Sequence, residues 1–391
     1  MNWISFGRVC FGLLLMLPAA PMARAENGVT ADQIKLGQAA ALDGPAGALG
    51  SGMRDGLRAA FDAANKAGGV KGRKIALISA DDGYEPAKSV VVAHQLIETD
   101  QVLALVGAVG TPTSAAIEPI AAEAGVPFIG AFTGAEFLRD PAKKEVINVR
   151  ASYFQETEMM VEHLTKDLGA TRIAIFYQDD AYGQAGLAGL KQALDKRQMS
   201  LAAEGTYERN TTAVKSALLA IRKAAPDAVV MIGAYKPSAE FIKLAKQVKF
   251  TPTFVNISFV GAEALARELG PAGAGVVVTQ VVPFPEDQSI PLVAQYQTAL
   301  KAASPDARPG FISLEGYIVG RLMTAALENI PGDITRAALL ETIAKTGRFD
   351  LGGLTLTYAA GNNRGSSQVF LTVIGPDGTL KPAEVLAKTS G

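Results

Sequence analysis

The residues best placed for chemistry lie at the start of a helical pattern, in the segment VGAVGTPT (106–113). An apolar stretch ends at Gly107, and Thr111 stands directly before Pro112. Threonine at the N-cap followed by proline at the first helical position is a favourable helix start. The free amides and the positive end of the helix dipole favour an anion there, and the Thr111 hydroxyl can donate to it. The segment predicts either an anion site or an ordinary capped helix.

Four further apolar stretches also end in hydroxyl groups or aromatic rings. In open α/β sheets, ligands bind beyond the carboxyl ends of the strands, so these residues are expected to face one cleft. Such a lining suits a small ligand with an apolar body and a few polar groups, although each turn alone also reads as a surface loop. The predicted lining consists of Thr111, Phe132, Thr133, Gly134, Tyr182, Tyr235 and Ser258.

The glycine-rich stretch ALDGPAGALGSGM (41–53) raises the question of a nucleotide site. It lacks the Gly-Lys-Ser/Thr ending of a phosphate-binding loop, and its glycines do not give the dinucleotide spacing G-x-G-x-x-G. It also contains no lysine or arginine. The stretch is better interpreted as a wall of another kind of ligand site, or as a simple tight turn.

Catalytic and metal-binding patterns are missing. His94 and His163, the two histidines, lie in helical stretches and form no H-E-x-x-H motif, and there is no G-x-S-x-G elbow. Asp81-Asp82-Gly83 does not complete a calcium loop. The adjacent acids Asp179 and Asp180 are more typical of a solvated or capping pair. We therefore expect no enzyme activity, no metal and no cofactor.

Alternating strand and helix patterns must position these residues. Continuous apolar runs of the strand type are typical of parallel strands covered on both faces, and helices of ordinary length fill the gaps between them. The expected strands are 34–40, 74–80, 102–107, 126–130, 172–177, 228–233, 253–257 and 275–281. The expected helices are one from about 53, then 86–99, 112–124, 154–168, 183–197, 212–224, 237–248 and 261–269, and a helix-rich block at 291–346.

The N-terminus has the pattern of a secretory signal peptide. Arg8 precedes an apolar run (9–17) that is too short for a membrane span, and Ala23-Arg24-Ala25 offers a cleavage site. An uncleaved anchor is the alternative. Cleavage after residue 25 removes Cys10, the single cysteine, and leaves 35 basic against 38 acidic residues, a net charge of −3. An exported protein without disulfides, and one that does not bind nucleic acid, is expected.

The remaining 366 residues are too many for one core and suggest two domains. The strand–helix rhythm breaks at 146–150 and again at the prolines of 281–285. We expect the chain to cross between two Rossmann-like α/β lobes with parallel sheets at both places and once more near 350–360. The expected division is 1–25 signal peptide, 26–148 plus 282–354 lobe 1, and 149–281 plus 355–391 lobe 2.

The sequence also resembles a known family, the type I solute-binding proteins of ATP-driven importers, in the leucine/isoleucine/valine-binding group. The resemblance covers nearly the whole chain after the signal peptide, and the motifs are specific through their order and spacing. They are LDGP (42–45), NKAGGVKG (65–72), DDGYEP (81–86), VGAVGTPTSAA (106–116), Tyr182-Gly183, and Gly233-Ala234-Tyr235 with Pro237.

The resemblance implies two lobes that close over a ligand about a hinge of three crossovers. It places Leu49 as a hydrophobic wall, where relatives often have an aromatic residue, and the Thr111 hydroxyl at the ligand α-carboxylate with help from the amides of 132–134. Tyr182 and Tyr235 are the aromatic residues of the second lobe that close over the ligand. A monomer that delivers its ligand to the membrane permease of an ABC importer in the periplasm is implied.

One departure bears on the ligand. Ser258 falls where relatives that bind amino acids have an acid that pairs with the α-ammonium, and an ammonium buried without a carboxylate is costly. Either another acid substitutes, with Asp43 and Glu315 as candidates, or the ligand has no amine. The expected function is capture of a small carboxylate, by family default a branched-chain amino acid. The alternatives are an amine-free organic or aromatic acid, or a ligand sensor that feeds a receptor kinase.

Overall fold

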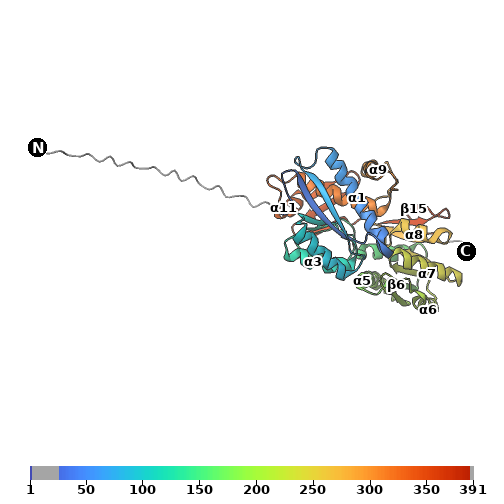
Figure 1. Ribbon diagram of the computed structural model, residues 1–391. Coiled ribbons are helices and arrows are strands. Elements are labelled where there is room, and N and C mark those ends of the chain that lie inside the picture. Colours follow the sequence, from blue (N-terminus) through green and yellow to red (C-terminus); the bar gives the residue numbers. More distant parts are fainter. Residues whose placement is uncertain (2–25, 388–391) are drawn as a thin grey trace.

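The computed structural model describes Met1 and residues 26–387, and two separate sheets organise them (Figure 1). The first sheet has five parallel strands in the order β2-β1-β3-β4-β5. Strands β3, β4 and β5 are buried along their whole length, because helices cover both faces of a parallel sheet. The strands are β1 (Gln33–Ala40), β2 (Lys74–Asp81), β3 (Ala104–Val106), β4 (Phe128–Ile129) and β5 (Val146–Ile147).

The second sheet has seven strands in the order β15-β14-β10-β9-β8-β6-β7. Five of them are parallel, and two antiparallel strands from the C-terminal part of the chain extend the sheet beside β10. The strands are β6 (Ile173–Gln178), β7 (Glu204–Tyr207), β8 (Ala228–Ile232), β9 (Thr253–Asn256), β10 (Val277–Gln280), β14 (Phe370–Ile374) and β15 (Leu380–Ala383).

Helices before β5 and after β10 pack around the first sheet. They are α1 (Gly47–Lys66), α2 (Pro86–His94), α3 (Thr111–Glu123), α9 (Pro291–Ala303), α10 (Phe311–Glu328) and α11 (Arg336–Thr346). Glycines let α1 and α10 pack closely: a Cβ on Gly56 would lie 1.9 Å from Ser313 O, and one on Gly316 would lie 2.3 Å from Met53 O. This tight contact fixes α10, which carries Glu315, against the N-terminal helix.

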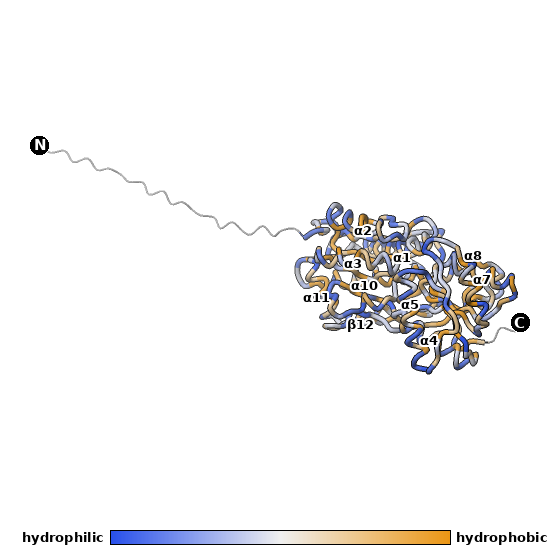
Figure 2. Tube along the Cα trace, turned by 90° about the horizontal axis from the view of Figure 1, so that it is seen from below, coloured by the Kyte–Doolittle hydropathy of each residue, from blue (hydrophilic) through white to orange (hydrophobic). Residues whose placement is uncertain are grey.

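The second lobe has its own helices. They are α4 (Tyr153–Lys166), α5 (Ala181–Asp195), α6 (Lys215–Lys223), α7 (Tyr235–Gln247) and α8 (Ala262–Leu269). Short helical turns complete both lobes: η1 (Gly44–Ala46), η2 (Gln95–Thr99), η3 (Glu136–Arg139), η4 (Ser258–Val260) and η5 (Gly270–Gly273). Hydrophobic and hydrophilic stretches alternate along the chain in both lobes (Figure 2), as expected where each helix buries one face.

The predicted α/β architecture is confirmed. All eight predicted strands are present, although most are shorter than their apolar runs, and the predicted helix 86–99 is α2 followed by the π-helical turn η2. Strand β7 and all strands after β10 were not predicted. These strands are short or half-exposed; β12 (Thr355–Ala359), for example, alternates buried and exposed residues. Most of them therefore lack the continuous apolar run by which the parallel strands were found; β14 (FLTVI) has such a run and was overlooked.

The chain passes between the lobes after β5 and again after β10. Strands β11 (Arg348–Asp350), β12 and β13 (Asn362–Gly365) form a third, antiparallel sheet, and Asn363 O accepts a hydrogen bond of 2.8 Å from the amide of Asn148 beside β5. The predicted lobe boundary at 354/355 runs through this sheet. We therefore propose that the third crossover follows Gly365, immediately before β14 joins the second sheet.

In the described part of the chain no helix is both long and apolar enough to cross a membrane. The predicted signal peptide, apart from Met1, lies outside the described residues.

Candidate functional site

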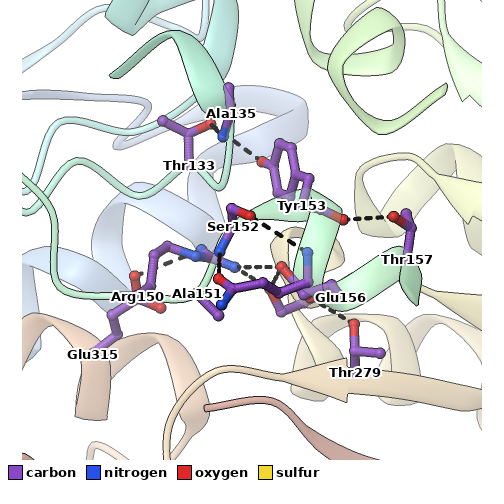
Figure 3. A network of polar contacts seen from close by, with 12 residues as sticks. Thr133, Ala135, Arg150, Ala151, Ser152, Tyr153, Glu156, Thr157, Thr279 and Glu315 are labelled. Carbon is purple, nitrogen blue, oxygen red and sulfur yellow. Dashed lines mark hydrogen bonds and ion pairs between the residues drawn. The ribbon is translucent and has the colours of Figure 1, made fainter. Parts of the chain in front are cut away.

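Three hydroxyl groups meet where the first lobe faces the second. Thr111 Oγ1 lies 2.7 Å from Thr133 Oγ1. Thr133 Oγ1 in turn lies 3.4 Å from the Tyr153 hydroxyl (Figure 3). All three side chains are buried. Burial raises the pKa of Tyr153, and the positive charge of Arg150 and the two threonines offset this only in part, so the phenol keeps its proton. We call Thr111, Thr133 and Tyr153 the hydroxyl cluster; it is a set of uncharged donors.

The start of α3 differs in detail from the prediction. The N-cap is Gly110, with φ of 108°, and Thr111 is the first helical residue, so its hydroxyl does not cap the helix but turns to Thr133. Glycine is required at the cap on two grounds: the positive φ, and the ring of Tyr84, whose Cε2 would lie 2.3 Å from a Cβ. The dipole and unpaired amides of the first turn still favour an anion.

Gly134 positions the tyrosine of the cluster. Tyr153 begins α4, and its amide donates a 2.7 Å hydrogen bond to Gly134 O. A Cβ on Gly134 would lie 2.4 Å from Tyr153 Cδ1, so a side chain would displace the ring. A capping box between Ser152 and Gln155 fixes the start of the helix that carries Tyr153.

The predicted help from the amides of 132–134 is wrong for two of the three. The Phe132 amide donates to Ala108 O at 2.7 Å, and the Thr133 amide donates to Ala131 O at 2.8 Å. Both donors are therefore occupied by the turn that follows β4. The side-chain hydroxyls, not these amides, are the donors of this turn.

Aromatic rings from both lobes pack beside the hydroxyl cluster. The ring of Phe259 lies 5.3 Å from that of Phe132, 4.6 Å from that of Tyr182 and 6.0 Å from that of Tyr84, measured between centroids. The Tyr182 ring also lies 5.6 Å from that of Tyr153. These distances are in the range of favourable aromatic pairs, so the rings form a continuous apolar wall next to the donors.

Leu49 and Tyr235, two of the predicted site residues, each approach the opposite lobe. A Cβ on Gly261, in the second lobe, would lie 2.7 Å from Leu49 Cδ2, which shows how closely Leu49 approaches. Burial raises the pKa of Tyr235, and the backbone of Ala48 in the first lobe partly offsets this. Both side chains are buried at the junction of the lobes.

Ser258 is hydrogen-bonded to an acidic residue, Glu156, which lies on α4. Glu156 Oε2 accepts from the Ser258 amide at 2.9 Å and from Thr279 Oγ1 at 2.6 Å. Its Oε1 accepts from Ser258 Oγ at 3.0 Å and from Arg150 Nη2 at 3.2 Å. A buried acid therefore does occupy the position beside Ser258, but four donors already engage its two oxygens.

Arg150 is the buried cation of this group. Its Nη2 donates to Ser258 Oγ as well as to Glu156, and its Nη1 lies 3.6 Å from Glu315 Oε1 (Figure 3). Its guanidinium carbon stands 4.9 Å above the ring of Phe132. Burial alone would lower the pKa of Arg150, but the charges of Glu315 and Glu156 outweigh burial and raise it. Arg150 is therefore always charged.

Glu315 is the second acid. Burial raises its pKa to about 7, with a further increase from Glu156 that the charges of Arg150 and Arg139 only partly oppose. It is the one of the two predicted substitute acids that lies near Ser258. Asp43, the other, caps η1 by accepting from the Gly44 amide. We call Arg150, Glu156, Ser258, Thr279 and Glu315 the ionic cluster.

Polar contacts at the rim of the junction also join the lobes. Arg209 donates to Glu85 and to Asp180, each at 2.9 Å, and Asn210 Nδ2 donates to Glu85 at 2.7 Å. Asp180 also accepts from the Tyr182 amide, which is the capping role expected of it. The side chains at the rim stay partly exposed, unlike those of the two clusters.

The structure brings all eight predicted site residues into one buried region at the lobe junction. Four further residues of this region were not predicted from the sequence, nor was the packing role of Phe259: they are Arg150, Tyr153, Glu156 and Thr279. The strand-end rule would have pointed to the first three, because they follow β5 within nine residues. Across the described residues, no group of three or more His, Cys, Asp and Glu side chains is arranged to hold a metal ion.

Comparison with known proteins identifies the family to which this fold belongs. A family model described as periplasmic binding protein matches residues 33–379. Leu/Ile/Val-binding protein homolog 7 of Brucella abortus is 24% identical over 334 residues, or 82% of each chain. Homolog 3 of Brucella melitensis is 30% identical over 204 residues, which are 52% of this chain and 54% of that protein.

A solved structure with a similar fold comes from Rhodopirellula baltica and is described as a possible leucine/isoleucine/valine-binding protein. It is 39% identical, has a TM-score of 0.86, and the match covers 93% of this chain and 100% of that one. A substrate-binding periplasmic protein from Ralstonia solanacearum is 27% identical, with a TM-score of 0.84 and coverage of 89% and 99%.

Proposed function

The chain belongs to the type I periplasmic binding proteins, in the leucine/isoleucine/valine-binding branch, and on that premise we propose that it captures a small carboxylate between its lobes. The hydroxyl cluster is the observation that carries the proposal. Thr111 and Thr133 come from the first lobe and Tyr153 from the second, so a ligand held by all three is held by both lobes. Binding then favours the arrangement in which the lobes meet.

The chemistry of the cluster fits a carboxylate. Three hydroxyl groups and the first turn of α3 offer donors and a positive dipole without a formal charge. The aromatic wall around Phe259 offers an apolar surface next to these donors. This combination favours a monocarboxylate with an apolar body over a sugar or a large polar solute.

Delivery of this ligand to the permease of an ABC importer is the second part of the proposal. The relatives that carry this family's name are binding proteins. The ion pair between Arg209 and Glu85 joins the two lobes at the rim, so that residues of both lobes together form a surface for a membrane partner. A role in sensing, with a receptor kinase as the partner, is the competing outcome. Loss of uptake of the ligand in a strain without the protein supports delivery; normal uptake with a lost transcriptional response supports sensing.

Ligand capture is tested with pairs that differ only in the carboxylate. Thermal unfolding of the purified protein is followed with 4-methylpentanoate against 4-methylpentanamide, 3-phenylpropanoate against its amide, and L-leucine against L-leucinamide. A ligand at 100 times its Kd stabilises by about 2.7 kcal/mol, which is readily seen. We expect stabilisation by at least one acid and by none of the amides.

A matched pair of variants localises the effect. Thr133→Val removes a hydroxyl of the cluster, whereas Thr165→Val removes one that bonds only to the backbone within α4. The first variant should lose the stabilisation by the acid and the second should keep it. Equal stabilisation by acids and amides, or an unchanged response in Thr133→Val, contradicts the proposal.

A further inference from the structure

The ionic cluster contains a donor that the rest of the described chain does not use. Arg150 is fully buried, yet its Nε atom has no hydrogen-bond partner among the described residues, and its Nη1 atom has only the 3.6 Å ion-pair contact with Glu315 Oε1. Glu315 Oε1 is likewise without a hydrogen-bond partner among them. A buried polar group without a partner is costly, and more so when it carries a charge. The Nε donor, unused on a buried guanidinium, therefore points to a group that joins the site from outside the chain.

The cluster lies beside the hydroxyl cluster. Arg150 and Tyr153 are separated by two residues at the start of α4, and the Arg150 guanidinium covers the ring of Phe132, the neighbour of Thr133. The Arg150 guanidinium and the hydroxyl cluster therefore both contact the turn that contains Phe132 and Thr133. The two clusters are neighbouring parts of one binding region.

An ammonium group fits this position poorly. Glu156 is already engaged by four donors, so it has no lone pair left in its present hydrogen bonds for a further one. Arg150 brings a positive charge, which repels a second cation. Glu315 is the remaining acid, and with a pKa of about 7 it holds a proton in a large share of molecules at neutral pH.

We propose that Arg150 forms a second ligand subsite, in which its Nε–H group donates to an oxygen acceptor next to the ligand carboxylate. The inference rests on the proposed capture of a carboxylate and names the ligand class: a 2-oxo or 2-hydroxy acid with an apolar body, in place of an α-amino acid. Glu156 is the positioning residue that holds Arg150, since it engages Nη2, while Glu315 faces Nη1 and Nε is left for the ligand.

The test is a set of ligands that share one apolar body and differ at carbon 2. Binding of 4-methylpentanoate, 4-methyl-2-oxopentanoate, 2-hydroxy-4-methylpentanoate and L-leucine to the wild-type protein is measured by calorimetry. A hydrogen bond from a charged donor gives the oxo and hydroxy acids about a 10- to 100-fold tighter Kd than the plain acid. L-Leucine should bind more weakly than the plain acid. The same order is expected for 3-phenylpropanoate, phenylpyruvate, 3-phenyllactate and L-phenylalanine.

The outcomes separate the two proposals. If L-leucine binds most tightly, or the oxo, hydroxy and plain acids bind equally, the second subsite is wrong while carboxylate capture stands. If the acids bind no better than their amides, or none of them binds, carboxylate capture is wrong and the subsite falls with it.

Two double variants assign the preference to Arg150. Arg150→Met with Glu156→Gln removes the guanidinium without leaving Glu156 as an unpaired buried charge, and the oxo acid should then bind within about threefold of the plain acid. Lys143→Met with Glu118→Gln removes another ion pair, of 2.6 Å, within the first lobe and should keep the preference. A preference that survives in the first double variant overturns the assignment. If that variant does not fold, the ligand set on the wild-type protein still decides.

Discussion

The hydroxyl cluster and the ionic cluster lie side by side at the lobe junction but are built on opposite principles. The hydroxyl cluster consists of neutral groups, and Thr111 and Thr133 both follow short parallel strands of the first sheet. The ionic cluster buries one guanidinium and two carboxyl groups from separate segments of both lobes. A neutral group can be lost at modest cost, whereas a buried charge depends on its partner.

Variants of the two clusters therefore report on different properties, ligand binding in one case and structural stability in the other. The hydroxyl cluster can be altered one residue at a time, so its variants report on the ligand. The ionic cluster joins Arg150 next to the first crossover, Thr279 next to the second and Glu315 on α10 of the first lobe, so its variants also report on the hinge. The following expected effects, from the largest to the smallest, sharpen or break this contrast.

Arg150→Met alone is expected to give the largest effect. It leaves Glu156 and Glu315 buried without their cation, and removal of one partner of a buried ion pair costs about 3–5 kcal/mol. Thr133→Val, in the neutral cluster, should cost about 1 kcal/mol. Urea unfolding of both variants measures the difference in the free energy of unfolding.

The double variant Arg150→Met with Glu156→Gln serves as the control. It should recover part of the stability lost in Arg150→Met, because the amide no longer requires a cation. Equal losses for Arg150→Met and Thr133→Val would remove the contrast between the clusters.

The same contrast explains what the sequence could predict. Thr111 and Thr133 were found because each follows an apolar strand directly, and the end of a parallel strand is recognisable locally. The predicted helices and most of the ten parallel strands were found for the same reason, through periodicity and apolar runs.

The ionic cluster could not be assembled in this way. Its contacts join residues 102 and 123 positions apart along the chain, as between Glu156 and Ser258 or Thr279. Composition and periodicity carry no signal for such pairs, and the resemblance drew attention to Ser258 only because an acid was absent there. Arg150 followed a strand and could have been noticed, but its pairing with two acids is a property of the folded chain.

The pH dependence of the free energy of unfolding is a further test of the ionic cluster. The pKa of Glu315 lies at about 7 in the folded protein and at about 4.5 without the effect of burial. Below pH 4.5 the Glu315 carboxyl is protonated in both the folded and the unfolded state. Between pH 4.5 and 7 only the unfolded state loses this proton, so the free energy of unfolding falls as the pH rises. Above pH 7 both states have lost it, and the free energy of unfolding levels off. The loss amounts to about 3 kcal/mol, with Arg150, Arg139 and Glu156 as the charged groups that face the carboxyl.

Comparison with Glu315→Gln isolates this contribution. The glutamine cannot titrate, so the stability of the wild-type protein relative to the variant should fall between pH 4.5 and 8. Burial raises the pKa of Asp82 to about 6, but that residue is present in both proteins and cancels. A difference that stays constant or rises with pH would show that Glu315 keeps its charge in the folded state.

Tyr153→Phe should affect the ligand more than the fold. The phenol bonds to Thr133 at 3.4 Å, so its removal should cost less than about 1 kcal/mol of stability, whereas the carboxylate loses a charge-assisted donor and binds about tenfold more weakly. Calorimetry with the acid that binds most tightly measures the change. Tyr296→Phe is the matched control, because its buried hydroxyl bonds to Ser313 at 2.6 Å outside the site. An equal effect of both variants on affinity would place the ligand away from Tyr153.

Arg209→Ala should give the smallest effect, because its ion pairs lie at the rim. Arg209 joins the lobes through Glu85 and Asp180, but its side chain is 23% exposed, and pairs in contact with water contribute about 0.2–1 kcal/mol. Loss of the contact should favour separation of the lobes and raise the dissociation rate of the ligand about two- to fourfold in stopped-flow measurements. High salt should produce a similar increase in the dissociation rate of the wild-type protein and little in that of the variant, since salt screens the same ion pairs.

Lys191→Ala is the control: it removes an ion pair of 3.2 Å with Glu204 inside the second lobe and should leave the dissociation rate unchanged. If Arg209→Ala slowed binding instead and left dissociation unchanged, the rim would act in ligand capture and not in retention, and the two buried clusters alone would hold the lobes together.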